Sequence, residues 1–406
     1  MSVTDFSETR TGTAQFGEAM RGEWPIEPGA IYLNHGTVGV VPRRVLAAQH
    51  AIREEIERHP SRFLLRELTS IVVGRPSEKV PRMRQAAAAV AEFLGARPED
   101  LAFVDNATTA ANAVLRSFPF EAGDEILVTD LGYGGVTNAA TFAARQRGAS
   151  IRVVTMPYPV RSASELTEAI VSAIGPRTRL AVIDHITSQS SLILPLSEIA
   201  AACHARRVAV LADGAHAPGA IALDIPSLGV DWYVANLHKW MWVPRASGII
   251  WAAPERQVGL HPAVVSWGLD QGMSAEFDLP GTRDPSPHLT APAALALMRE
   301  YGVENVRQYN HRLAWSGAHL LAQRWGTTFE VPESMVGTMA TLEMPEPLGK
   351  SADEALAVRD RLLFDHNIEV QVHSFRDRMH VRICGQVYNT MQEIEALGEA
   401  VLTMAG

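Results

Sequence analysis

Two segments of this chain, VAVLADGAH (residues 208–216) and DWYVANLHKW (residues 231–240), decide its fold class. Each contains an apolar run of the length of a strand that is buried on both faces, VAVLA in the first and WYVA after Asp231 in the second, and polar residues follow each run. The first segment places Asp213 directly after a predicted strand, and the second places Lys239 shortly after another. In open α/β sheets, ligands bind at the edge formed by the carboxyl ends of the strands. The two segments therefore predict an α/β protein with a charged site at that edge.

Apolar runs of the same kind continue through the middle of the chain. They read LAFV (101–104), EILVT (125–129), IRVVT (151–155), LAVID (180–184) and GIIWA (248–252). Helical patterns at 135–147, 162–174 and 195–206 lie between them. Such alternation predicts a seven-stranded, mainly parallel sheet with helices on both faces. The strands at 231–235 and 248–252 are expected at the edge of this sheet.

The flanking regions predict a second, smaller domain. Helices are expected at 42–59 and 77–94, the latter ending at Gly95, and a helical block runs from 287 to about 324. Beyond it come strands at 338–343, 368–372 and 380–383 between helices at 352–365 and 388–403. The predicted organisation is an N-terminal arm (1–30), a large domain (31–290), linking helices (291–325) and a small α+β domain (326–406).

Composition excludes several classes of protein. The 406 residues are 47% hydrophobic and 20% charged, which is ordinary globular usage. The excess of 45 acidic over 36 basic residues argues against a nucleic-acid partner. Two cysteines are too few for a disulfide framework, and the first ten residues carry acids where a signal peptide needs basic residues. We therefore expect a cytoplasmic protein with no membrane or nucleic-acid partner.

Asp213 and Lys239 are the pair of residues that carries chemistry. The chain has no phosphate-binding glycine loop, no HExxH motif and no Cys/His metal spacing. Lys239 lies among Leu237, Trp240 and Trp242, which favours an uncharged, nucleophilic amine. A lysine that forms a Schiff base and an aspartate that keeps a pyridinium nitrogen protonated are what a pyridoxal cofactor requires. An ordinary surface lysine and a helix-capping aspartate are the alternative interpretation.

The motifs DGAH (213–216) and NLHKW (236–240) resemble those of the class V aminotransferase-like group of fold-type I pyridoxal-phosphate enzymes. Within that group the sequence most resembles isopenicillin N epimerase-like proteins. The resemblance extends from LNHG (33–36) to Arg382 and YNT (388–390). It implies a fold-type I transferase fold, pyridoxal 5'-phosphate as the cofactor, and Lys239 and Asp213 as catalytic residues.

The resemblance also implies which residues bind the cofactor. Phosphate would be bound at the start of the helix after LAFV, and the ring would be stacked on Tyr133 with its hydroxyl near Ser188 and His216. A loop threonine would reach the phosphate of a second subunit, which implies a homodimer with shared active sites. The implied cofactor-binding residues are Ala107, Thr108, Thr109, Tyr133, Ser188, Asp213, His216, His238, Lys239 and Thr282.

Substrate recognition is expected from other segments. An α-carboxylate is bound well by the two parallel N–H groups of a guanidinium. Arg382 matches the arginine that has this role in the family, and Asn34 and His35 lie in a segment that lines the substrate cavity of relatives. A small amino-acid-like substrate is therefore expected.

The sequence indicates the cofactor more closely than it indicates the reaction at Cα. Lys239 would act as the general base in epimerisation, β-elimination or transamination alike. The first hypothesis is an isopenicillin N epimerase-like epimerase or racemase, and the alternative is a carbon–sulfur lyase or related enzyme of the same family. A third is a domain that binds ligand without catalysis. A persulfide-forming desulfurase is disfavoured, because Cys203 lies within a predicted helix. QVHSF (371–375), which resembles the segment where one branch of desulfurases carries its cysteine, has none.

Overall fold

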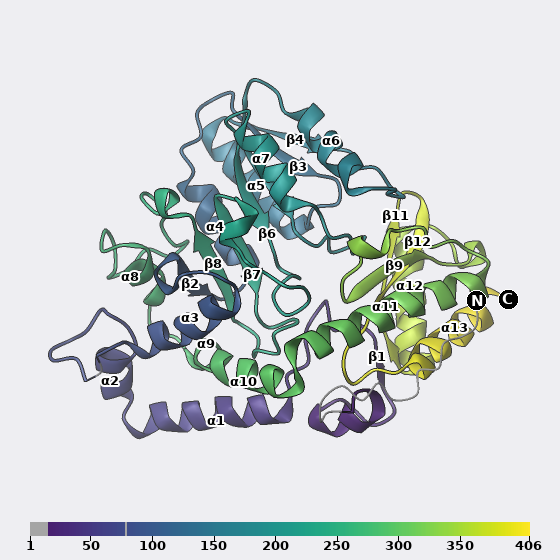
Figure 1. Cartoon of the computed structure of the whole chain (residues 1–406), viewed down its shortest axis with the longest axis horizontal. Coiled ribbons are helices and arrows are strands. Elements are labelled where there is room, and N and C mark those ends of the chain that lie inside the picture. Colours follow the sequence, from purple (N-terminus) through teal and green to yellow (C-terminus); the bar gives the residue numbers. More distant parts are fainter. Residues whose placement is uncertain (1–14, 78) are drawn as a thin grey trace. The chain divides into compact units, whose positions relative to one another are not determined.

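A computed structural model describes residues 15–77 and 79–406 of the chain, so residues 1–14 of the predicted N-terminal arm lie outside it. The chain divides into two compact units (Figure 1). The larger unit contains Arg44–Leu295 and Glu330–Val336. The smaller unit contains the described residues up to Arg43 together with Ala296–Phe329 and Gly337–Gly406.

A seven-stranded sheet forms the centre of the larger unit. Its order is β2-β8-β7-β6-β5-β3-β4, and only β8 runs antiparallel to its neighbours. This confirms the predicted mainly parallel sheet. The strands are β2 (Leu101–Val104), β3 (Glu125–Thr129), β4 (Ser150–Val154), β5 (Thr178–Asp184), β6 (Ala209–Asp213), β7 (Trp232–Asn236) and β8 (Gly248–Ala252).

The predicted position of β7 and β8 at the edge of the sheet is wrong. The edges are β2 and β4, and β7 and β8 lie between β6 and β2. β8 turns back to pair antiparallel with β7, and β2 then pairs with the free side of β8, from Leu101↔Trp251 to Val104↔Gly248. Gly248 permits this packing, because a Cβ there would lie 2.5 Å from the Ala235 carbonyl oxygen.

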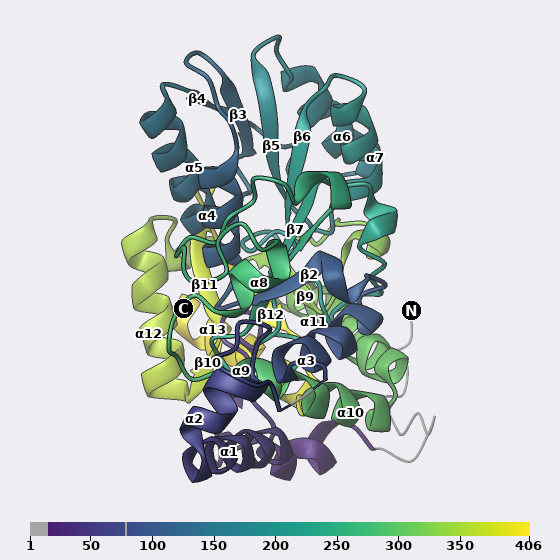
Figure 2. The same cartoon turned by 90° about the vertical axis from the view of Figure 1, so that its left-hand side faces the viewer.

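Helices cover both faces of the sheet. α4 (Ala107–Ser117) and α5 (Gly134–Arg147) lie on one side, and α6 (Ala163–Ala173) and α7 (Leu196–His204) lie on the other (Figure 2). α4 presents a run of buried alanines to the sheet, and their small size lets its backbone approach closely. α6 begins at its N-cap Ser162, whose side chain accepts the Glu165 N–H, and α5 ends at Gly148 with φ +68°.

The remaining helices around this unit are short or interrupted. They are α1 (Arg43–Arg58), α2 (Pro60–Arg62), a π-helical turn (Phe63–Glu67), α3 (Arg82–Phe93), α8 (Met273–Asp278), α9 (Ser286–Leu289) and α10 (Ala291–Tyr301). α3 begins later than the predicted residue 77, because Pro81 disfavours helical backbone in the residue before it. The predicted helical block after 287 is divided into separate helices, with a break at Gly302, whose φ is +79°.

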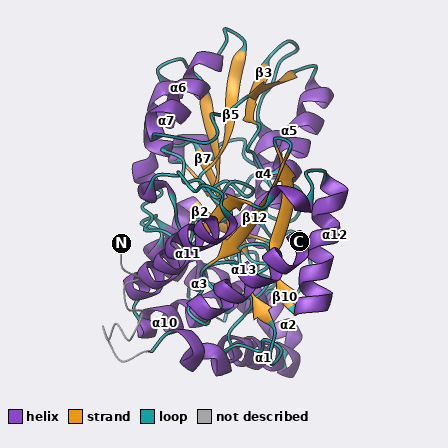
Figure 3. Cartoon of the chain, turned by 90° about the vertical axis from the view of Figure 1, so that its right-hand side faces the viewer, coloured by secondary structure: helices purple, strands orange, loops and turns teal. Residues whose placement is uncertain are grey.

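The smaller unit has the predicted α+β composition. Its antiparallel sheet has the order β11-β12-β9, formed by Gln371–Phe375, Arg378–Cys384 and Met339–Glu343. The helices are α11 (Val303–Trp325), α12 (Ala352–His366) and α13 (Met391–Ala405), and Figure 3 shows α12 beside the strands. The predicted strand 368–372 is split, since β10 (Ile368–Glu369) pairs with β1 (Ile31–Tyr32). Within the described residues, no helix is long and apolar enough to cross a membrane.

Candidate active site

Lys239 lies in the turn that follows β7, and its amine contacts a histidine. The Nζ atom is 2.9 Å from Nε2 of His216, and Lys239 is 9% exposed. Trp240 and Trp242 beside it are buried, and Trp242 has a φ of +60°, which is uncommon for a bulky residue. The turn thus holds a lysine amine in an apolar setting at the carboxyl edge of the sheet.

Asp213 ends β6 at the same edge and is 2% exposed. Its Oδ1 accepts the Ala215 N–H at 3.0 Å, whereas its buried Oδ2 has no hydrogen-bond partner within residues 15–77 and 79–406. Burial raises the pKa of Asp213, although the Ala215 N–H and the charge of Lys239 oppose that effect. A buried acceptor without a donor is costly. The protonated ring nitrogen of a pyridoxal cofactor is a donor of the required kind, so the residues fit that group.

A second buried carboxyl group at this edge was missed by sequence reasoning. Asp184 ends β5 in register with Asp213 on β6, and its Oδ1 accepts the Tyr133 N–H at 3.3 Å. Burial and the neighbouring charge of Asp213 raise the pKa of Asp184 well above its ordinary value. Two buried carboxyl groups this close do not both ionise readily, so we expect the pair to retain a proton. An available sequence signal was the final Asp of LAVID, which repeats the pattern of VAVLAD.

Tyr233 and His185 form a buried layer next to this acidic pair. The Tyr233 hydroxyl lies 2.8 Å from His185 Nδ1, and burial lowers the pKa of His185 to about 4. Gly214 is required there, because a Cβ at that position would lie 2.2 Å from the Tyr233 ring. The neutral His185 and the tyrosine therefore support the backbone that follows Asp213.

The N-terminus of α4 offers the predicted anion-binding position. Asn106 caps the helix by accepting the Thr109 N–H at 2.9 Å, and Asn236 Oδ1 accepts the Ala107 N–H at 2.8 Å. The Thr108 hydroxyl makes no hydrogen bond with any described residue. Since Ala107 N–H is already engaged, Thr108 is the group best placed to donate to a phosphate. Asn236, which ends β7 near Lys239, was not predicted. Its side chain connects the segment that carries Lys239 to the N-terminus of α4.

The other predicted cofactor-binding residues are dispersed around this edge. His238 Nδ1 lies 3.2 Å from the Ser247 carbonyl oxygen, and burial lowers the pKa of His238 to about 4. Tyr133 is 48% exposed, and Ser188 is half-buried in the loop after β5. Thr282 is exposed, and the next residue, Arg283, pairs with Asp105 at 2.6 Å beside the cap of α4.

The predicted substrate residues all lie in the smaller unit. Arg382 is buried, and its Nη2 donates to Asn34 Oδ1 at 3.2 Å and to Thr37 Oγ1 at 2.5 Å. Burial lowers the pKa of Arg382. His35 Nδ1 lies 2.9 Å from the Tyr388 hydroxyl. Asn34 and Arg382 are thus in direct contact, whereas Thr37 and Tyr388 are partners that the sequence did not single out.

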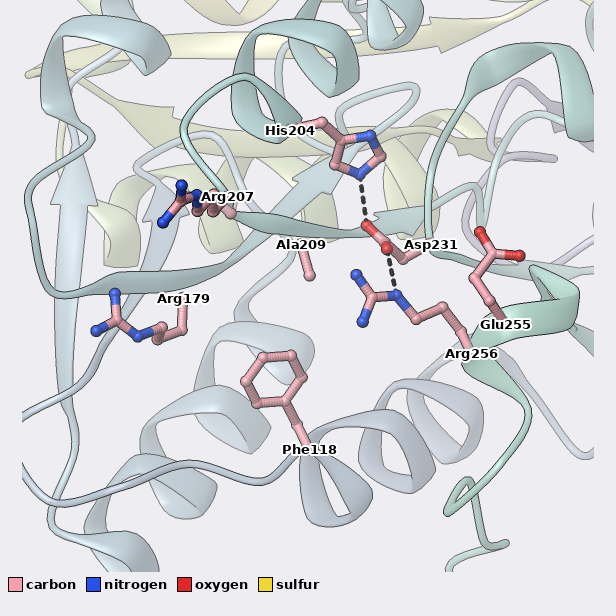
Figure 4. A pocket seen from close by; sticks show the side chains of 9 residues that line it. Phe118, Arg179, His204, Arg207, Ala209, Asp231, Glu255 and Arg256 are labelled. Atoms are coloured by element: carbon pink, nitrogen blue, oxygen red, sulfur yellow. Dashed lines mark hydrogen bonds and ion pairs between the residues drawn. The ribbon is translucent and has the colours of Figure 1, made fainter.

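A different cluster of charges occupies the amino edge of the large sheet (Figure 4). Asp231 there accepts hydrogen bonds from His204 Nε2 at 2.8 Å and from Arg256 Nε at 2.6 Å, and also from the Val210 N–H at 2.6 Å. Asp231, His204 and Arg256 line a cavity of about 440 Å³, together with Phe118, Arg179, Arg207, Val208, Ala209 and Glu255. None of the predicted site residues lies in it, and the ion pairs join the residue before β7 to the end of α7 and to the segment after β8.

Comparison with known proteins identifies the family. Residues 69–397 match the class V aminotransferase family. An isopenicillin N epimerase from Streptomyces clavuligerus is 31% identical, with 96% of this chain and 98% of that protein covered. A putative L-cysteine desulfhydrase 1 from Oryza sativa subsp. japonica is also 31% identical, with 92% and 83% covered.

Solved structures agree in fold. The apo cysteine desulfurase from Thermococcus onnurineus NA1 superposes with a TM-score of 0.78 at 17% identity, with 97% of this chain and 99% of that chain covered. C-DES with glycine covalently linked to its PLP cofactor gives 0.74 at 22% identity, with 94% and 98% covered. Together with the family match, these findings confirm the predicted fold-type I architecture. The chain is a pyridoxal-phosphate-dependent enzyme and belongs to the class V aminotransferase family.

Proposed function

We propose that this enzyme takes a proton from Cα of an amino-acid substrate and returns one on the opposite face, as an isopenicillin N epimerase-like epimerase. The observation that carries the proposal is the buried Lys239 amine held 2.9 Å from His216 at the edge where Asp213 keeps an unpaired Oδ2. Pyridoxal phosphate, when bound, supplies an electron sink for the charge that develops at Cα. Lys239 would attach the cofactor and would act as the general base.

The neighbouring groups support this base. His216 would orient the amine through its Nε2 contact, as well as lying near the ring hydroxyl with Ser188. Asp213 would accept the hydrogen bond of a protonated ring nitrogen through its unpaired Oδ2, and the positive charge of that ring would favour the anionic form of the carboxyl group. Tyr133 would cover one face of the ring.

Two further groups of residues would bind the phosphate of the cofactor and the α-carboxylate of the substrate. The Thr108 hydroxyl would donate to the phosphate, with Ala107, Thr109 and His238 beside it and Thr282 reaching it across a homodimer. The α-carboxylate would be bound by Arg382, whose guanidinium is positioned by Asn34, with His35 nearby. Buried guanidinium groups bind carboxylates strongly because little water competes.

Chemistry through a cysteine persulfide is disfavoured. Both cysteines of the chain are buried, and burial raises the pKa of Cys203 to about 11. Cys384 accepts the Gly36 N–H at 3.3 Å. A reactive thiol needs access and a lowered pKa. Neither cysteine meets both conditions.

The second candidate is a carbon–sulfur lyase. The observation in its favour is that relatives named L-cysteine desulfhydrase match this chain as well as the epimerases do. Lys239 would again take the Cα proton, and the electron pair would then expel the sulfur substituent at Cβ. No protein cysteine is needed for that elimination.

One experiment separates these reactions. The enzyme is incubated with a panel of amino acids in deuterated water, and the Cα proton is followed by NMR while ammonia, keto acid and sulfide are assayed. Deuterium in the recovered amino acid with loss of chirality supports epimerisation. Release of keto acid and sulfide without inversion supports the lyase. Absence of Cα exchange with every amino acid tested would overturn both.

A further inference from the structure

β11 and β12 of the smaller unit bring two histidines and an arginine to one face of their sheet. His373 on β11 pairs with His380 on β12, and Gln371 pairs with Arg382. Side chains alternate between faces along a strand, so His373, His380 and Arg382 share a face. Diagonal neighbours of this kind have side-chain origins about 7–8 Å apart. His373 is therefore within reach of a small molecule bound to Arg382.

His373 is buried without the hydrogen bonds that a buried ring requires. It is 9% exposed, and neither ring nitrogen has a hydrogen-bond partner in the part of the chain that the structure describes. Its ring stacks on His380, with centroids 6.0 Å apart and planes at 20°. Buried polar groups are nearly always paired, because an unpaired one destabilises the folded protein. The ring thus has one donor and one acceptor to offer.

The charges around His373 keep its ring neutral. Burial lowers the pKa of His373 to about 4, and the neighbouring His380 and Arg382 act in the same direction. Glu343, opposite His380 on β9, acts on His380. A neutral imidazole both donates and accepts a hydrogen bond. The neutral His373 ring can therefore hydrogen-bond a hydroxyl, thiol, amide or carboxylate, but not an alkyl group.

We propose that His373 is a specificity-determining residue, and that it hydrogen-bonds a polar group in the side chain of the substrate whose α-carboxylate is bound by Arg382. The inference rests on the proposed function for the role of Arg382. It adds the substrate class, which is α-amino acids with a hydrogen-bonding side chain in preference to aliphatic ones of the same size. The missing hydrogen bonds of the His373 ring would be supplied by that side chain.

The adjacent residue on β11 provides a matched control. Ser374 points to the opposite face of the sheet, where its hydroxyl donates to the Lys350 carbonyl oxygen at 2.5 Å. Ser374→Ala therefore removes a polar group from the same strand without touching the face that carries Arg382. His373→Leu removes both hydrogen-bonding atoms, and His373→Gln retains a donor and an acceptor.

The test measures dissociation constants of the holoenzyme for two isosteric pairs, serine with 2-aminobutyrate and homoserine with norvaline. Wild type is expected to prefer the polar member of at least one pair by about 3- to 10-fold, the scale of one hydrogen bond. His373→Leu should abolish the preference, while His373→Gln and Ser374→Ala should retain it. An unchanged preference in His373→Leu overturns the proposal, and so does the absence of any preference in wild type.

A second readout detects the contact without turnover. In holoenzyme with isotopically labelled histidine, the His373 ring resonances should shift on addition of homoserine and much less on addition of norvaline. Equal shifts with both ligands would argue for a packing role only and would overturn the proposal. A polar preference that depends on His373, found without Cα exchange in deuterated water, supports this contact and overturns the proposed reaction. Failure of all four amino acids to bind overturns both.

Discussion

The two edges of the large sheet contain buried carboxylates with opposite kinds of surroundings. At the amino edge, Glu125 accepts hydrogen bonds from Arg152 and Arg177, and Asp231 accepts from three donors. At the carboxyl edge, Asp213 has one backbone donor and an Oδ2 with none among the described residues. The acids are similarly buried, so burial alone does not distinguish them. The distinguishing property is whether the protein itself completes their hydrogen bonds.

The same difference appears in the pKa values. Arg152 and Arg177 lower the pKa of Glu125, whereas burial raises the pKa values of Asp213 and Asp184. Glu125 thus contributes stability above its unfolded pKa, and that contribution is lost as pH falls through its folded pKa. The raised pKa values of Asp213 and Asp184 have the opposite effect, since stability from these groups is present below their unfolded pKa and is lost as the pH rises. The amino edge is arranged for stability, and the carboxyl edge retains unsatisfied groups that a cofactor would use.

Lys239→Ala is expected to give the largest effect at the carboxyl edge. Removal of the proposed general base should lower kcat for Cα proton exchange on the order of 10³-fold. Borohydride treatment of the wild type should fix the cofactor on the peptide that contains Lys239, and this adduct should be absent from the variant. The chain has three lysines, so Lys350→Ala, on the exposed surface, is a matched control that should keep both activity and adduct. An adduct that persists in Lys239→Ala would refute the assignment.

Asp213→Asn is expected to reduce activity with little loss of stability. The amide keeps the shape of the side chain but lacks the charge that would hold a proton on the ring nitrogen, so kcat should fall by about 10²-fold. The free energy of unfolding should change little, since the protein leaves Oδ2 unpaired in any case. Steady-state kinetics and urea unfolding of the same preparation check both parts. An unchanged kcat would contradict the role of Asp213.

Asp231→Asn makes the same substitution at the amino edge and should have the reverse effect. It weakens the hydrogen bonds from His204, at the end of α7, and from Arg256, after β8, to the residue that precedes β7. Both donors are about two-fifths exposed, so water partly replaces the lost partner, and the expected loss is about 1–2 kcal/mol of unfolding free energy. Urea unfolding measures this loss, and kcat at saturating substrate should stay within twofold. A kcat reduced as strongly as in Asp213→Asn would remove the distinction between the edges.

The sequence was sufficient to predict those features that depend on short segments. The apolar runs that end in Asp213 and precede Lys239 predicted the strands, and with them the position of both side chains at the carboxyl edge of the sheet. The order of the strands was not predictable in the same way, because the insertion of β8 between β7 and β2 depends on pairing between distant segments. Asp184 was overlooked for that reason, since only the adjacency of β5 and β6 places it beside Asp213.

In the smaller unit, too, the pairing between distant segments could not be predicted from short stretches of sequence. QVHSF alternates as a strand should, but it does not indicate which residue of a later segment faces His373. The register of β11 with β12 places His373 opposite His380 and diagonal to Arg382. A shift of one residue would turn the histidine to the other face. The arginine was predicted by resemblance, and its neighbours became evident only from the pairing.

Asp184→Asn provides the smallest expected effect and the most specific test of the electrostatic difference. The folded-state pKa of Asp184 is raised, chiefly by burial and then by Asp213. Stability from the protonated group is therefore fully present below its unfolded pKa, about 3.9, and is lost as pH rises through the folded pKa. Asparagine does not ionise, and its side-chain oxygen can still accept the Tyr133 N–H. In cofactor-free protein, the variant should match the wild type near pH 4 and become more stable than it toward pH 8. Urea unfolding across this range measures the difference, and a variant less stable than wild type at pH 8 would show that the Asp184 carboxylate stabilises the fold as the amino-edge acids do.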